Sequence, residues 1–259
     1  MGLCVSKSSG TSMSGGRDAH SATSASPRHE RAQNRNARQA RSDLAQLSDL
    51  NRSRPTISAA GSSSIQARRT GALPSTAAQA AVTDVLRLVR ETYYKPNLKS
   101  GNKVKGDGGP EEFERQQQAT DEVERMRMED DPLEAAMQGR AHQCQELTLL
   151  AVHYLQERGL RAQVLELGGD DVAVTHNVAV IGPASNPLPA DMKKWHPDVY
   201  VCDPWSNIAC RAKDYPEQFA NKMKKWEGAG KLVGFMLKGF VLPTDRQWMH
   251  DVLHGRKEL

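Results

Sequence analysis

Hydrophobic residues are distributed unevenly along the chain. From Met1 to about Ser75 the sequence is mostly Ser, Thr, Ala, Gly, Gln and Arg, with almost no aromatic residue and few large aliphatic residues. Such a segment cannot bury enough apolar surface to offset the entropy of ordering it, so residues 1–75 are predicted to be a disordered leader. Regular apolar patterns follow, and they predict one folded domain over residues 76–259.

Apolar residues at helical spacing predict a first helix over residues 75–94. Val82, Leu86 and Val89 lie near that spacing, and Pro96 follows its end. Further elements are predicted as follows: a loop over 97–110, a charged helix over 111–128, a turn and a basic helix over 209–230, one or two strands over 231–243 that complete the sheet, and a closing helix over 244–255.

Another amphipathic helix is predicted to begin at Cys144. Leu147, Leu150 and Tyr154 follow at intervals of three and four residues, and Gly159 provides the stop. The first N–H groups of a helix have no intrahelical acceptor and carry partial positive charge, which favours a thiolate and can hold an oxyanion. The alternative interpretation is a small buried cysteine with a packing role.

Three short segments rich in β-branched residues follow this helix: 161–167, 174–181 and 199–203. They are predicted to be antiparallel strands. A register that places Val180 opposite Val199 also places His176 opposite Asp203, within reach of an imidazole–carboxylate hydrogen bond.

These elements suggest a nucleophilic triad. Cys144 would attack a carbonyl, His176 would take the thiol proton, and Asp203 would fix the imidazole tautomer. Taken singly, His176 could be a core histidine and Asp203 part of a strand-ending turn. His142 and His153 are alternative bases.

The order of these residues resembles the transglutaminase-like branch of the papain-like cysteine hydrolases. The matching positions are Cys144, the acidic Glu146, the strand residue His176 and the pair Asp203-Pro204, and the resemblance covers roughly residues 138–210. It implies an α+β fold in which the helix bearing the cysteine packs on an antiparallel sheet. It also implies acyl-transfer chemistry at a peptide bond or a glutamine carboxamide.

The same resemblance implies an oxyanion-hole donor six residues before the cysteine. Gln138, followed by Gly139, stands at that spacing, and Gln143 is the competing candidate. Two departures are present: Gln143 replaces the small residue expected before the cysteine, and no aromatic residue follows His176. These differences leave the substrate open, along with the choice of water or an amine as acyl acceptor.

The charge of the chain is concentrated in the leader. Eleven basic residues oppose four acidic ones within residues 1–75, about +7, while the whole chain carries +4. Without interleaved aromatic residues or a known reader module, nucleic acid is not an expected partner. The four cysteines show no paired framework and are expected to be reduced; a zinc site at Cys202 and Cys210 is weakly supported by its spacing. No metal or organic cofactor is expected.

The first residues fit an acylation pattern. Gly2 with Ser6 matches N-myristoylation, and Cys4 offers a site for palmitoylation, the second signal that stable anchoring requires. The alternative is a chance match in a low-complexity leader. The start MGLCVSK before a Ser-rich stretch resembles the lipidated type III secreted effectors of plant-associated bacteria, whose leaders also carry the export signal.

Together these patterns predict a secreted effector that acts inside a host cell, at the cytoplasmic face of the plasma membrane. Its expected activity is that of a Cys-His-Asp thiol enzyme on a host protein: a protease, a deamidase or a transglutaminase. The alternative from another class is a catalytically inactive, membrane-tethered binding module that docks a host protein.

Overall fold

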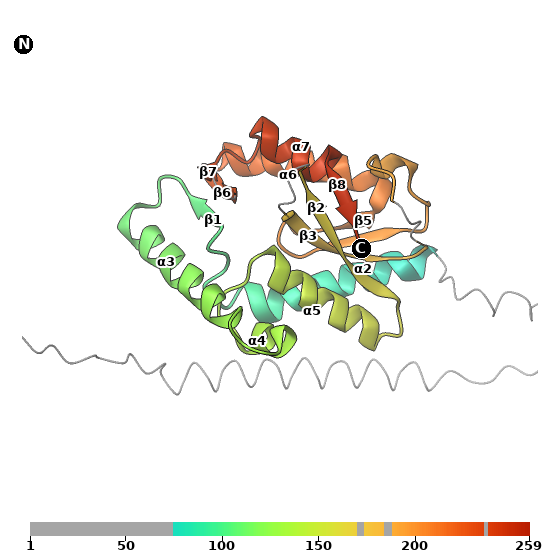
Figure 1. Ribbon diagram of the computed structural model, residues 1–259, viewed down its shortest axis with the longest axis horizontal. Coiled ribbons are helices and arrows are strands. Elements are labelled where there is room, and N and C mark those ends of the chain that lie inside the picture. The colour runs from blue at the N-terminus through green and yellow to red at the C-terminus, as the bar shows by residue number, and fades with distance from the viewer. Residues whose placement is uncertain (1–74, 170–173, 184–187, 236–237) are drawn as a thin grey trace, which may run out of the picture. The chain divides into compact units, whose positions relative to one another are not determined.

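The computed structural model describes residues 75–169, 174–183, 188–235 and 238–259, which form α-helices and two antiparallel β-sheets (Figure 1). The predicted α+β class is therefore confirmed. The predicted leader, with Gly2 and Cys4, lies outside the described residues except for Ser75, which begins the first helix.

Most helices of the described residues occur where the sequence predicts them, but the helix Pro132–Gln138 was not predicted. The predicted first helix divides into α2 (Ser75–Val89) and a π-helical turn (Arg90–Tyr94). The other α-helices are α3 (Gly109–Met126), α4 (Pro132–Gln138), α5 (Cys144–Glu157), α6 (Tyr215–Gly228) and α7 (Arg246–His254). Short 3-10 turns lie at Met192–Lys194 and Ala212–Asp214. The predicted stop of α5 is confirmed, because Gly159 adopts a positive φ of 75° that a side chain would disfavour.

The main sheet has five strands in the order β5-β4-β3-β2-β8, all antiparallel. The strands are β2 (Ala162–Gly168), β3 (Val174–Ile181), β4 (Tyr200–Asp203), β5 (Ile208–Arg211) and β8 (Arg256–Glu258). Residues 176–181 of β3 are all buried, as expected for a strand covered on both faces. α2 and α5 pack on one side of this sheet, and α6 and α7 lie on the other (Figure 1).

The pairing of β3 with β4 corrects the predicted register. Val180 lies opposite Val201, not opposite Val199, so the strands are displaced by two residues. Because side chains alternate with a period of two, this displacement leaves His176 and Asp203 on the predicted face. They are diagonal neighbours instead of directly opposed ones, a separation that an imidazole can still span.

A second sheet, in the order β1-β6-β7, also departs from the prediction. Its strands are β1 (Lys103–Lys105), β6 (Lys231–Phe235) and β7 (Gly239–Val241). The strands predicted over 231–243 are present, but they pair with β1 and do not extend the main sheet. β1 lies within the predicted loop, and its three residues, Lys-Val-Lys, are too few to show a pattern.

Candidate active site

Cys144 is the first residue of α5, as its apolar spacing predicts, and it is partly exposed. The start of this helix is fixed by Glu146, whose carboxylate accepts a hydrogen bond from the backbone N–H of Gln143 at 2.9 Å. Arg127 donates its Nε–H to the other carboxylate oxygen at 2.9 Å. Because Cys144 stands in the first turn, its own N–H has no intrahelical acceptor. The resemblance placed Glu146 near the nucleophile, and here it anchors the segment that carries the thiol.

His176 and Asp203 form the predicted pair. Nε2–H of His176 donates to Oδ2 of Asp203 at 2.9 Å, and both side chains are fully buried. A carboxylate only accepts, so this bond assigns the proton to Nε2. Nδ1 is then the nitrogen left to exchange a proton with a nucleophile, and no described residue makes a hydrogen bond of ordinary geometry to it.

Asp203 is held by more donors than the sequence indicated. The backbone N–H of Ser206 donates to Oδ1 at 2.9 Å, and the Tyr215 hydroxyl donates to Oδ2 at 2.9 Å. The Ser206 hydroxyl also donates to Oδ2. Burial alone would raise the pKa of Asp203, but His176 and Ser206 outweigh it and lower that pKa. The carboxylate therefore stays ionised in a fully buried position.

The imidazole of His176 interacts electrostatically with both the Asp203 carboxylate and the Cys144 side chain. Burial alone would lower the pKa of His176, but the Asp203 carboxylate, followed by the Cys144 side chain, raises it to about 10. Cys144 thus lies close enough to His176 to affect its protonation. The structure brings Cys144, His176 and Asp203 together, and it favours a protonated imidazole between sulfur and carboxylate.

Aromatic rings surround the imidazole and keep water from it. The ring centroids of Trp205 and Phe219 lie 5.1 and 5.7 Å from that of His176, and Trp248 lies at 6.4 Å. Trp205 is only 1% exposed. Its indole N–H donates to Asn102 Oδ1 at 3.0 Å. Trp195 and Trp226 are buried as well.

Cys144 opens into a cleft of about 880 Å³ between the two sheets. Side-chain amides and glycines dominate its wall, with Arg127, Lys238 and Asp251 as the charged members. β7 contributes Phe240, a large apolar residue that is 41% exposed. A wall of uncharged donors and acceptors matches the polarity of a polypeptide backbone or a carboxamide. The lining residues that carry side-chain amides are Asn102, Gln116, Gln143, Gln145, Asn177 and Gln247.

The two candidates for the oxyanion hole are placed differently. Gln138, the predicted donor, is exposed at the end of α4, where its amide N–H donates to Glu134 at 2.6 Å, and it does not line the cleft. Gln143 is the N-cap residue of α5 and does line the cleft beside Cys144. Its side-chain Oε1 accepts from Arg127 Nη2 at 3.3 Å, which leaves its side-chain NH₂ group available. The spacing of six residues does not bring Gln138 to the thiol, because α4 ends at that residue.

The alternative bases have other partners. His142 is fully buried, with Nε2 2.7 Å from the carbonyl of Ala136, and burial lowers its pKa. His153 lies more than two turns along α5 and faces Glu157 at 3.3 Å. His196 is exposed.

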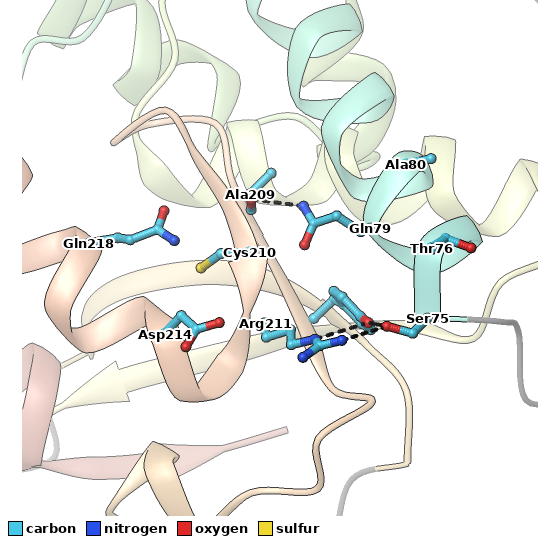
Figure 2. Close-up of a pocket in the computed structure, with 10 residues that line it drawn as sticks. Ser75, Thr76, Gln79, Ala80, Ala209, Cys210, Arg211, Asp214 and Gln218 are labelled. Carbon is cyan, nitrogen blue, oxygen red and sulfur yellow. Dashed lines mark hydrogen bonds between the residues drawn. The ribbon is translucent and has the colours of Figure 1, made fainter.

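The other described cysteines, Cys202 on β4 and Cys210 on β5, are both buried. Burial raises the pKa of Cys210 to about 12 and raises that of Cys202 further. Cys210 lines a second pocket of about 700 Å³ between α2 and β5 (Figure 2), where Arg211 donates to Ser75 Oγ at 2.8 Å. That pocket contains no member of the triad. Within the described ranges, no group of three or more His, Cys, Asp or Glu side chains is arranged to hold a metal ion.

Sequence reasoning did not predict Ser206, Tyr215 or the aromatic residues around the imidazole as parts of the site. Ser206 follows Asp203 by three residues, the spacing at which an aspartate commonly caps a turn, so this contact had a local signal. Tyr215 comes from α6 and had none.

Two further findings bear on identity. None of the helices formed by the described residues has the length and apolar character needed to cross a bilayer. Comparison of the chain with protein-family models, with curated proteins and with solved structures found no match in any of the three.

Proposed function

We propose that the domain is a cysteine hydrolase or acyltransferase with a papain-like, transglutaminase-like core, acting on protein substrates. The observation that carries this proposal is the orientation of the His176 ring, with one nitrogen bonded to Asp203 and the other left for a nucleophile. Asp203 occupies Nε2 at 2.9 Å, while Nδ1 has no ordinary hydrogen bond and the Cys144 side chain raises the pKa of the ring. This is the arrangement of an activated nucleophile.

In the proposed reaction, the Cys144 sulfur attacks the carbonyl carbon of a peptide bond or a glutamine carboxamide. The proton of the thiol resides on His176 Nδ1, and Asp203 stabilises the imidazolium. The oxyanion would accept from the Cys144 N–H and from the Gln143 amide, the candidate that lines the cleft. His176 then protonates the departing nitrogen, the carbon–nitrogen bond breaks and an acyl-enzyme remains.

The acceptor that resolves this acyl-enzyme determines the activity. Water at a peptide carbonyl gives a protease, water at a glutamine side chain gives a deamidase, and an amine gives a transglutaminase. The volume of the Cys144 cleft and its amide-rich wall support a polypeptide substrate. The leader motif supports the further proposal that the protein is a secreted effector held at a host membrane through Gly2 and Cys4.

The test uses a glutamine-containing protein such as casein, with and without a primary amine, followed by mass spectrometry. Cleavage, conversion of glutamine to glutamate, or attachment of the amine would each identify one of the three activities. Cys144→Ala, His176→Ala and Asp203→Asn should each abolish that product while the circular dichroism spectrum stays folded. Undiminished activity in folded Cys144→Ala would contradict the proposal. A folded protein that modifies no protein substrate but binds one equally well without the thiol would favour the binding module.

A further inference from the structure

A cluster of cations lies around the aromatic rings that include Trp205, the ring that also packs on the His176 imidazole. The Lys103 ammonium is 4.7 Å from the Tyr94 ring centroid, 4.8 Å from that of Trp205 and 4.3 Å from that of Trp226. The Arg90 guanidinium shares the Tyr94 ring at 4.8 Å, and Lys231 shares the Trp226 ring at 5.3 Å. Three cations from separate elements therefore converge on one set of aromatic side chains.

Local geometry adds a fourth cation to this group. On α6, Lys222 precedes Trp226 by four residues, so the two side chains share a helix face. On the second sheet, Lys231 of β6 lies directly opposite Lys105 of β1. Like charges in directly opposed positions destabilise a strand pair, so this arrangement opposes folding stability. We call Arg90, Lys103, Lys222 and Lys231 the basic cluster.

No member of the basic cluster forms an ion pair with a carboxylate of the described residues. Arg90 and Lys103 instead donate to the backbone carbonyls of Pro204 and Trp205, the latter at 3.1 Å. Burial, followed by the charges around each group, lowers the pKa of Lys103, Lys222 and Lys231. The nearby carboxylate of Asp203 is fully buried and already bonded to His176. The cluster thus gathers four basic side chains with no carboxylate of the described residues in ion-pair contact, although Glu91, Glu112 and Asp203 act on them from a longer distance.

We propose that the basic cluster binds an anion bearing several phosphate groups. Its members differ in exposure, since Lys103 is enclosed by rings whereas Lys222 and Lys231 are only partly buried. Exposed Lys99 and Lys225 lie near enough to Lys231 to act on its charge. Several cations that converge on one place suit a compact ligand of high charge, and both guanidinium and ammonium groups are effective phosphate binders. This site is separate from the Cys144 cleft and does not depend on the proposed reaction.

Two sources could supply this ligand chemistry: a soluble inositol polyphosphate or the head group of a phosphoinositide. The test therefore has two arms with the unacylated full chain. Inositol hexakisphosphate is titrated by calorimetry at low and high salt. Vesicles of phosphatidylcholine, with or without phosphatidylinositol 4,5-bisphosphate, are sedimented with the protein. Binding in the first arm alone indicates the soluble source, and binding in the second arm alone indicates the membrane.

The decisive variant is Lys222→Gln/Lys231→Gln, with Lys193→Gln/Lys194→Gln as a control of equal charge change on an exposed turn. The cluster variant should weaken binding by about tenfold or more, while the control changes it less than about threefold. Without ligand, the cluster variant should melt at a higher temperature than the wild type, because neutralisation removes repulsion. Absence of binding in both arms, or equal weakening in both variants, would overturn the proposal. A melting temperature below that of the wild type would instead indicate a structural role for these lysines.

Discussion

At the residue scale, the pairing of His176 with Asp203 was predictable even though its register was not. Alternation along β3 and β4 fixes which face each side chain occupies, and a displacement of two residues preserves that face. The sequence contains no comparable signal for Tyr215, which reaches Asp203 from a helix packed against the sheet. It likewise could not show that α4 ends at Gln138 and keeps its side chain away from the thiol.

The raised pKa of His176 predicts how stability depends on pH. The folded protein binds the imidazole proton more tightly than the unfolded chain, whose histidine has the ordinary pKa of 6.5. This contribution is therefore fully present below pH 6.5 and is lost as pH rises through about 10. We expect the difference in free energy of unfolding between wild type and His176→Gln to shrink over that interval. Urea denaturation at several pH values measures it, and a difference independent of pH would contradict the assignment.

At the element scale, long periodic segments were predictable and short ones were not. The helix starting at Cys144 and the strands around His176 and Asp203 occur where their patterns indicated. β1 and β8 have three residues each, mostly charged, and exist because longer strands provide a partner edge. Their formation depends on tertiary pairing, which local pattern does not encode.

The start of α5 should depend on Glu146 more than on its partner Arg127. The Glu146 side chain is 6% exposed and satisfies both Arg127 and the Gln143 N–H, whereas the Arg127 side chain is 44% exposed. We expect Glu146→Ala to lower the free energy of unfolding by about 1–3 kcal/mol because it leaves the partly buried Gln143 N–H without its acceptor at the helix start. Arg127→Ala should cost less than about 1 kcal/mol, since a half-exposed ion pair contributes little. Equal losses in denaturant titrations of the two variants would show that the capping contact does not set the stability of this helix start.

At the scale of the whole molecule, the α+β class and its antiparallel pairing were predictable, and the division into two sheets was not. The pattern over 231–243 identifies strands but not their partners, and β6 pairs with β1 across more than a hundred residues. Residues of both sheets line the Cys144 cleft, so the residues of its wall could not be predicted without knowing how the strands pair.

The acylation motif predicts how the whole protein distributes in a eukaryotic cell. Gly2→Ala removes the N-terminal glycine whose amine accepts the myristoyl chain, and Cys4→Ser removes the thiol that would be palmitoylated. We expect Gly2→Ala to move the protein from the membrane to the soluble fraction. Cys4→Ser should give partial release, because a single myristoyl chain holds a protein only marginally. Membrane association of Gly2→Ala equal to that of the wild type would argue against lipidation.

The central claim is that the Cys144 thiol is activated by His176. Site-resolved alkylation of the unacylated full chain with iodoacetamide, at about pH 6, tests it most directly because only a thiolate reacts appreciably there. We expect Cys144 to be labelled about tenfold or more faster than Cys4, Cys202 or Cys210, and His176→Ala to remove this difference in rate. Labelling of Cys144 no faster than Cys4, or unchanged in a folded His176→Ala variant, would contradict the claim.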